Sequence, residues 1–281
     1  NKIYTNSNSD VSVTATVSNG TCSKTNLFTI NKVVRKEFTN NDGVWSNNGN
    51  WLPNGIPNIT EHCVVIPNGK KASVNIPNAE SKALTVENGG VLVVETGMAL
   101  TVQEQIINLG DGTNFTVEND ANLIQVADIT NEGDITVKRN TSMKKNDYTY
   151  WGSPVEGQNL RAFSPGKLYT YNEWDDYFTL LNGTDNFDSK AKGYAIQAGP
   201  AHQSGVSTAF NGVFLGKPKN GNIVMTLKRQ GRGYNLIGNP YPSNIDFAEL
   251  YAANSDLIYN TAYFWTNLNH NPMSQGSNYP N

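Results

Sequence analysis

Apolar and polar residues alternate along most of this chain, which is the pattern of β-strands rather than of helices. Between Leu84 and Val137 six such segments follow one another, and most are separated by turns that carry glycine. Because successive side chains of a strand point to opposite faces, apolar residues two positions apart face a core together. The inward pairs are Leu84/Val86, Leu92/Val94, Leu100/Val102, Phe115/Val117 and Ile135/Val137.

The spacing of these segments indicates a repeat. Leu84, Leu92 and Leu100 are eight residues apart, as are Phe115 and Leu123. This interval leaves no room for a helix between strands, but it fits the coils of a solenoid or a meander. We therefore predict a short β-helix-like stack over residues 43–140.

Trp45 and Trp51 precede this stack in a loop rich in Asn, Gly and Pro. Aromatic rings in such a loop can stack on sugars, or they can close the open end of a hydrophobic core. We favour the second interpretation, because a tryptophan buries the largest apolar area of any side chain and the end of a solenoid needs a cap.

The N-terminal region predicts a hairpin. VSVTATV and TCSKTNLFTI are two strand-like segments around an Asn19-Gly20 turn. Since a two-stranded hairpin is not stable by itself, we interpret residues 1–34 as the C-terminal strands of an immunoglobulin-like domain and a linker. The earlier strands of that domain are then expected upstream of residue 1.

From Tyr148 onward the repeat is lost and the apolar segments become rich in aromatic residues. They read YTYWGSP, KLYTYNEW, GYAIQA, NIVMTLK, YNLIGNPYPS and AYFWTN. Such segments at irregular intervals predict a β-sandwich of jelly-roll type over residues 141–281. Only residues 245–253 have helical composition, with Asn244 or Asp246 as the cap, so the expected fold is all-β with one short helix.

The sandwich region also contains a duplication. YWGSPVEGQNLRAFSP followed by YTYNEW resembles LIGNPYPSNIDFAEL followed by YFWTN. Each unit runs from a strand through a Gly-polar-Pro turn and a short packed segment to an aromatic strand. The second unit is expected to lack its closing strands, which predicts that the chain is a piece of a longer protein.

Charge and composition exclude several partners. The formal net charge is -3 and the pI is about 5.7, so no basic field attracts nucleic acid or anionic lipid. No run approaches the ~20 apolar residues that a membrane span requires, and we expect no membrane insertion. Cys22 and Cys63 lack the spacing of a metal or redox motif, and two unrelated thiols are favoured over a bridge between them.

Motifs of catalysis are missing from the sequence. The passage GRGYNLIG has Leu236 where a dinucleotide-binding loop needs its third glycine, and no P-loop, GxSxG or HExxH motif occurs. Asp175 and Asp176 are adjacent on an expected strand, so they point to opposite faces and cannot act together on a sugar. We expect no enzymatic activity and no cofactor.

Two sets of residues are candidates for ligand binding. Asn182, Asp185 and Asp188 bring three oxygen-bearing side chains into one loop, as a calcium site requires, although their spacing is not that of an EF-hand. Exposed tryptophans would form a stacking platform for glycans. The candidates for this platform are Trp45, Trp51, Trp174 and Trp265.

Four segments carry a resemblance to a known group of proteins. DYTYWGSPV (residues 147–155), FSP (163–165), KGYAI (192–196) and NLIGNPYPSNIDF (235–247) resemble, in order and spacing, a module common in large secreted proteins of Bacteroidota. The W…NW..G.P opening and the repetitive GxLxV stretch are similar as well. The resemblance covers about residues 43–281.

This resemblance implies export by the type IX secretion system and a place on the cell surface or in the medium. Many proteins of this kind resemble gliding or biofilm adhesins with tandem immunoglobulin-like modules. We therefore expect a non-catalytic structural or adhesive module whose partners are the export machinery and surface glycans or surface proteins. A carbohydrate-binding module and a polysaccharide-degrading enzyme domain are the alternatives.

Overall fold

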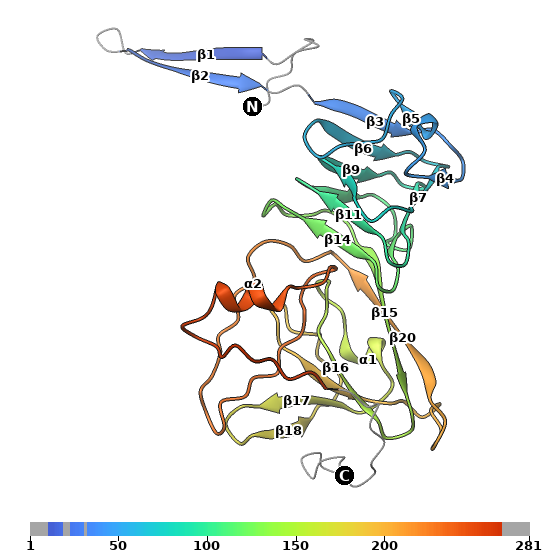
Figure 1. Ribbon diagram of the computed structural model, residues 1–281, viewed down its shortest axis with the longest axis vertical. Helices are drawn as coiled ribbons and strands as arrows, with labels where there is room; N and C mark the ends of the chain where they lie inside the picture. Colours follow the sequence, from blue (N-terminus) through green and yellow to red (C-terminus); the bar gives the residue numbers. More distant parts are fainter. Residues whose placement is uncertain (1–10, 19–22, 31–32, 266–281) are drawn as a thin grey trace.

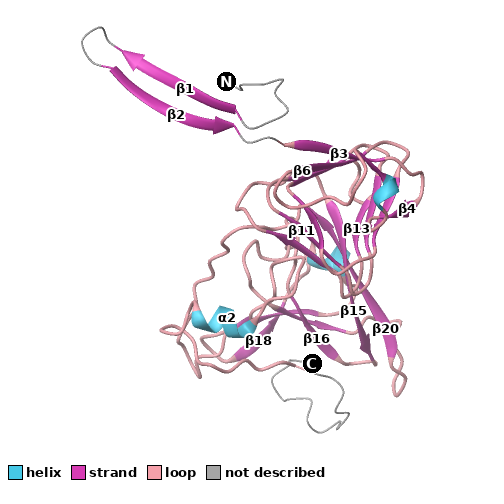
Figure 2. Cartoon of the chain, turned by 45° about the horizontal axis from the view of Figure 1, so that its top comes forward, coloured by secondary structure: helices cyan, strands magenta, loops and turns pink. Residues whose placement is uncertain are grey.

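The computed structural model describes residues 11–18, 23–30 and 33–265, and this part of the chain is almost entirely β. Figures 1 and 2 show three parts in chain order: a projecting hairpin (residues 11–30), a solenoid (residues 34–137) and, below the solenoid in Figure 1, a lower unit (residues 135–265). The hairpin consists of β1 (Val11–Ser18) and β2 (Ser23–Ile30), which pair antiparallel and form a sheet of their own within the described residues. The predicted hairpin is confirmed, while its Asn19-Gly20 turn and Cys22 lie outside the described residues.

The solenoid has three faces, each a sheet whose strands come from successive coils. One face is built from β3 (Val34–Phe38), β5 (Trp51–Leu52), β6 (His62–Ile66), β9 (Ala83–Val86) and β12 (Ile106–Asn108). A second is built from β4 (Gly43–Val44), β7 (Lys71–Val74), β10 (Val91–Val94), β13 (Phe115–Val117) and β15 (Ile135–Met143). The third is built from β8 (Ala79–Ser81), β11 (Ala99–Val102) and β14 (Asn122–Gln125).

The eight-residue spacing corresponds to the three sides of one coil. Leu84, Leu92 and Leu100 lie on the first, second and third face, and all three are buried. Each stacks in parallel register on its neighbours in the adjacent coils, and the register pairs are Leu84 with Val64 and Ile106, Leu92 with Ala72 and Phe115, and Leu100 with Ala79 and Leu123. Burying each such Leu, Val or Phe is worth about 1.5–3 kcal/mol relative to exposure, so the stack is a hydrophobic column. The predicted β-helix-like stack is confirmed.

The upper end of the column is closed by aromatic rings. Trp51 packs edge-on against Phe38 and Trp45, with ring centroids 5.0 and 4.7 Å away, and its indole Nε1 donates to the Trp45 carbonyl at 2.9 Å. A 3₁₀ turn at Asn48–Asn50 (η1) carries the chain between the two tryptophans. Among the described residues, the peptide bond between Leu52 and Pro53 is cis.

The strand β15 belongs to both the solenoid and the lower unit. Its first residues continue the second face, because Thr136 and Val137 pair in parallel with β13. Its whole length pairs antiparallel with β20 (Thr208–Gly216), which ends the parallel sheet. The last rung of the solenoid is therefore also the first strand of the unit below it (Figure 1).

The lower unit contains a four-stranded antiparallel sheet in the order β16 (Tyr148–Trp151), β19 (Tyr194–Gln197), β17 (Leu168–Asn172), β18 (Tyr177–Leu180). One face of this sheet packs on β20 through Trp151, and Phe163 and Phe214 stack nearby with centroids 4.4 Å apart. These rings belong to the same buried cluster as the solenoid core. The layers are those of a sandwich, with fewer strands in the described residues than the eight of a jelly roll.

Two short helices are present in the described residues, not one. The expected helix is α2 (Phe247–Ala252), and Asp246 caps it by accepting from the Ala248 and Glu249 amides. The unexpected one is α1 (Leu160–Phe163), capped by Asn159. A single turn has too few residues to show a helical period in the sequence, so only its cap could have indicated it.

Three predicted strands are absent. Residues 222–228, 234–243 and 262–265 form no strand, while the last two residues of the predicted segment 262–267 lie outside the described part of the chain, and an isolated bridge joins Ile237 to Lys192. Residues 222–228 still alternate between exposed and half-buried positions, as a strand would. What they lack among the described residues is a neighbouring strand to pair with, which an alternating pattern cannot specify.

Candidate functional site

Trp45 and Trp51, proposed from the sequence as part of a glycan platform, are buried. Their exposed fractions are 0% and 2%. A sugar ring can stack only on an accessible aromatic face, so this assignment is wrong for both residues. Their position agrees with the capping role that the sequence favoured.

Trp174 and Trp265 differ from each other. Trp174 lies in the turn between β17 and β18 and is 67% exposed, so its ring is available to a ligand. Trp265 is 40% exposed, but its ring stacks on Tyr150 at 5.6 Å and its Nε1 donates to the Tyr148 carbonyl at 2.8 Å. Trp265 therefore has a packing role, and Trp174 is the better candidate for glycan contact.

The carboxylates beside Trp174 are engaged with their own hairpin. Asp175 accepts a hydrogen bond from the Asn172 amide at 2.7 Å. Asp176 accepts from the Tyr171 hydroxyl and pairs with Arg232 at 3.1 Å. Burial and the neighbouring Asp176 raise the pKa of the Tyr171 phenol. These contacts fix the turn that presents Trp174.

In the loop that was a candidate calcium site, oxygen atoms of Asp185 and Asp188 already accept hydrogen bonds from backbone amides. The Asp188 carboxylate accepts from the Lys190 amide at 2.7 Å, and the Asp185 carbonyl accepts from the Leu160 amide at 3.0 Å. Asn182 and Asp185 are exposed. Within the described residues no group of three or more His, Cys, Asp or Glu side chains could hold a metal ion, and the calcium site stays a prediction.

The Pro-Tyr-Pro-Ser motif closes the lower end of the solenoid. The Pro242 carbonyl accepts from the Leu123 amide of β14 at 2.9 Å and from Arg139 Nη2 at 3.2 Å. Two residues further on, the Asn244 amide donates to Asn122 Oδ1 at 2.7 Å. The motif thus pairs with the free edge of β14, where the next coil would otherwise lie.

A buried asparagine closes the neighbouring face. Asn131 Oδ1 accepts from the Ile106 amide at 3.0 Å, and its Nδ2 donates to Gln125 Oε1 at 2.7 Å and to the Pro218 carbonyl at 3.2 Å. Together with β20 on the second face, the lower end of the solenoid is sealed on all three sides. Since an unpaired strand edge invites association with other chains, these contacts keep the stack finite.

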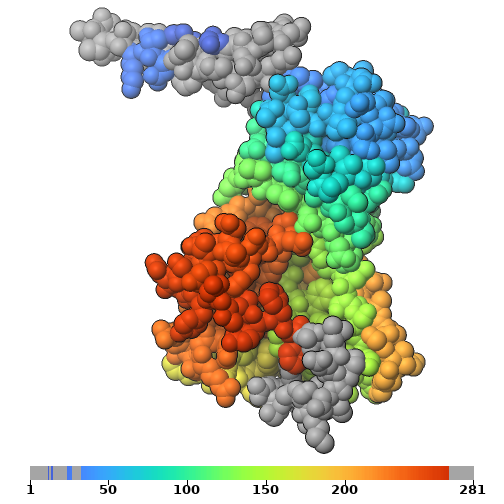
Figure 3. All heavy atoms as spheres, in the orientation of Figure 1, coloured from blue at the N-terminus to red at the C-terminus, as the bar shows by residue number. Residues whose placement is uncertain are grey.

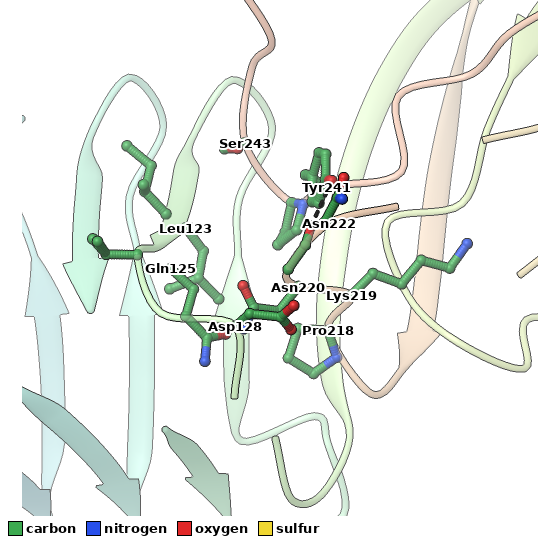
Figure 4. A pocket seen from close by; sticks show the side chains of 13 residues that line it. Leu123, Gln125, Asp128, Pro218, Lys219, Asn220, Asn222, Tyr241 and Ser243 are labelled. Atoms are coloured by element: carbon green, nitrogen blue, oxygen red, sulfur yellow. Dashed lines mark hydrogen bonds between the residues drawn. The ribbon is translucent and has the colours of Figure 1, made fainter. Parts of the chain in front are cut away.

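A cleft of about 370 Å³ opens beside this seal. One wall is β14 with the loop after it, including Ile124, Val126 and Asp128. The other wall is formed by residues 218–222 and by Tyr241 to Ser243 (Figure 4). In Figure 3 the orange and red C-terminal segment packs beside the green end of the solenoid, so the cleft lies where the two units meet.

Two of the side chains that line this cleft, Tyr241 and Lys219, are held by hydrogen bonds to backbone carbonyls. The Tyr241 hydroxyl donates to the Gly221 carbonyl at 2.7 Å, which holds the ring in place. Lys219 is buried, its Nζ donates to the carbonyls of Asp188 and Lys190, and burial lowers the pKa of its ammonium group. The sequence could not have revealed this cleft, because three segments far apart in the chain form it.

No helix in the described residues is long and apolar enough to cross a bilayer. Cys63 is free and half-buried, and burial raises the pKa of its thiol, so the reactive thiolate form is disfavoured. This residue therefore offers no activated nucleophile.

One comparison with known proteins gives a match. The family model described as "Domain of unknown function (DUF8693)" matches residues 38–281. No curated protein and no solved structure matches the chain. The matched region begins at Phe38, in the aromatic cap, and includes both the solenoid and the lower unit.

Proposed function

The chain belongs to the DUF8693 family, and for this member we propose a non-catalytic structural and adhesive role in an extracellular protein of a bacterial surface. The solenoid with its lower unit acts as a stiff segment, and the exposed parts of the lower unit make contact with other molecules. The observation that supports the stiff segment is the shared strand β15, which pairs with β13 in the solenoid and with β20 in the lower unit.

Stiffness follows from the way the two units are joined. A linker between domains permits hinge motion, whereas β15 is paired on one side with β13 and on the other with β20 in a single sheet, and it does not bend without breaking these ladder bonds. The buried cluster also runs without interruption from Leu123 in the solenoid to Phe163 and Phe214 in the lower unit. A spacer that holds a contact surface away from a cell needs such a junction.

The proposed location rests on the resemblance of the YWGSP and GNPYPS segments to secreted Bacteroidota modules. Export by type IX secretion and attachment to a cell surface belong to the same proposal. Antibodies against the chain should label intact cells of the source organism, and deleting the type IX outer-membrane channel should remove the label. Labelling only after permeabilisation would contradict the surface assignment.

The junction is tested by pulling single molecules from residues 33 and 265. We expect the solenoid and the lower unit to yield in one cooperative event, because they share β15 and one core. Phe214→Ala removes a buried ring between the two units and should split this event into two. Val213→Ala, at an exposed position of the same strand, is the matched control. Two separate events in the unmodified chain would refute the stiff-segment role.

Carbohydrate binding through Trp174 is a second candidate function, favoured by the exposure of this ring at a hairpin turn. Beads coated with the chain should then attach to a glycan-bearing surface, and Trp174→Ala should reduce their attachment. Tyr177→Ala, a partly exposed aromatic residue on the adjoining strand, serves as the control. Equal attachment by all three proteins would exclude Trp174 as the contact.

A further inference from the structure

The cleft between β14 and the Pro-Tyr-Pro-Ser motif has unpaired polar groups that no structural role explains. Within the described part of the chain, the side chains of Asp128, Asn222 and Ser243 make no hydrogen bond or ion pair, and all three line the cleft. By contrast, the amide groups of Gln125 and Asn220 in the same walls donate to backbone carbonyls. The cleft therefore offers a carboxylate, an amide and a hydroxyl to a ligand.

These three groups come from separate segments. Asp128 follows β14, Asn222 follows β20 and Ser243 ends the proline motif. Figure 4 shows the side chains of the two walls on either side of the opening. Convergence of free polar groups from distant segments on one concave surface is the usual arrangement of a small-molecule site, and a volume of about 370 Å³ lies within the common range of roughly 300–1,000 Å³.

The remaining lining is apolar and rigid. The Tyr241 ring is anchored by its hydroxyl, Pro242 is held by Leu123 and Arg139, and Ile124 and Val126 are exposed beside them. A pre-ordered aromatic ring costs little entropy on binding and suits the apolar face of a sugar ring. Carboxylate and amide groups suit its hydroxyls.

Charge narrows the class of ligand further. The two cations near the cleft, Lys219 and Arg139, already donate to backbone carbonyls. The one free charged group among the described residues that line the cleft is the Asp128 carboxylate, and it repels an anion. An uncharged ligand rich in hydroxyl groups fits these conditions, whereas a uronic acid or a sulfated sugar does not.

We propose that this cleft binds one or two units of a neutral saccharide, with Asp128 and Asn222 as the hydrogen-bonding residues and Tyr241 as the stacking ring. This proposal deepens the adhesive function proposed above and rests on it, because it names a site and a class of ligand for adhesion. It is independent of Trp174, which lies on the turn between β17 and β18.

The test is binding of the whole 281-residue chain to a panel of neutral hexoses, N-acetylhexosamines and their disaccharides, followed by saturation-transfer NMR and calorimetry. At least one member should bind. Asp128→Ala and Asn222→Ala should each weaken binding roughly tenfold or more, which is the usual loss for a hydrogen bond to a charged or well-placed polar group. Both positions are exposed, so the thermal midpoint should not change.

Asp134→Ala is the matched control, because Asp134 is an exposed aspartate near the same junction whose side chain lies outside this cleft. Its affinity should equal that of the unmodified chain. The proposal is overturned if no neutral sugar binds, if the two cleft variants bind as well as the control, or if only anionic sugars or a basic peptide bind.

Failure of this site and failure of the adhesive function give different results. If no neutral sugar binds in solution but coated beads still attach to surfaces, adhesion stands and the cleft assignment falls. If sugars bind in solution but beads and cells never attach, the cleft is a saccharide site and the adhesive role is refuted.

Discussion

Gly152 and Gly238, the glycines of the two Gly-polar-Pro turns, pack backbone against backbone. A Cβ atom on Gly152 would lie 2.7 Å from the Cα of Gly238, and one on Gly238 would lie 2.5 Å from the Cα of Gly152. Each turn is followed by a capped short helix, α1 after the first and α2 after the second. The two turns of the predicted duplication therefore contact each other, and each glycine leaves room for the backbone of the other.

Substituting either of these glycines should destabilise the lower unit. A methyl group cannot fit at such distances unless the two backbones move apart, and overpacking of this kind costs about 1–3 kcal/mol. We expect Gly152→Ala and Gly238→Ala to lower the free energy of unfolding by this amount in chemical denaturation. Gly49→Ala is the control, since its added carbon would have no atom closer than 3.4 Å. Three equally stable variants would show that the backbones are not in contact.

The buried amine of Lys36 should stabilise the upper cap. Lys36 is 2% exposed, and its Nζ donates to the carbonyls of Pro53, Asn54 and Gly55 at 2.8, 3.1 and 2.6 Å. Burial lowers the pKa of this group, yet three carbonyls compensate its charge. Lys36→Met leaves those carbonyls unsatisfied and should cost about 1–3 kcal/mol of unfolding free energy.

The neighbouring Arg35 provides the comparison. Its ion pair with Glu37 is exposed to solvent, so Arg35→Met should cost no more than about 1 kcal/mol. Amide exchange near Pro53 should accelerate in the Lys36 variant alone. A larger loss of unfolding free energy in the Arg35 variant would contradict the stabilising role of the three carbonyls around Lys36 Nζ.

Asn131 should hold the lower end of the solenoid together. Asn131→Ala removes the acceptor of the buried Ile106 amide and the partner of Gln125, which should cost about 1–3 kcal/mol. Glu132→Ala, at the exposed position beside it, should have little effect. Urea denaturation measures both, and faster amide exchange at Ile106 in the Asn131 variant would locate the loss.

Stability of the upper cap should fall in mild acid because of His62. Its Nδ1 accepts from the Asn58 amide at 2.9 Å, which requires the neutral ring. Burial, and secondarily the charge of Lys36, lower the pKa of His62 below its ordinary value of 6.5. The unfolded chain therefore binds a proton at a higher pH than the folded chain, so stability is complete above about pH 6.5 and declines as pH falls below it.

A thermal-denaturation series between pH 7.5 and 5 measures this decline. His62→Gln removes the titrating ring, and its midpoint should change less over the same range than that of the unmodified chain. Identical pH profiles for the two proteins would show that His62 is not responsible.

Much of the fold was determined by the sequence alone. Alternation with a period of two predicted which residues face inward, and the eight-residue interval predicted a solenoid or a meander, because in a three-sided coil this interval leads from one side to the next. The roles of Trp45 and Trp51 as a cap and of Asp246 as a helix cap also depended on local properties. These features depend on residues that are close in the chain, so they can be predicted from the local sequence pattern.

The tertiary structure decided which edges find partners and where surfaces meet. The alternating segment 222–228 looks like a strand but pairs with no other strand among the described residues, whereas Pro242, in a turn, accepts a hydrogen bond from the edge of β14. The cleft lined by Asp128, Asn222 and Tyr241 depends on the same long-range contacts. A sequence pattern specifies which face of a segment is apolar. Which other segment packs against that face depends on distant parts of the chain, and a local pattern contains no information about them.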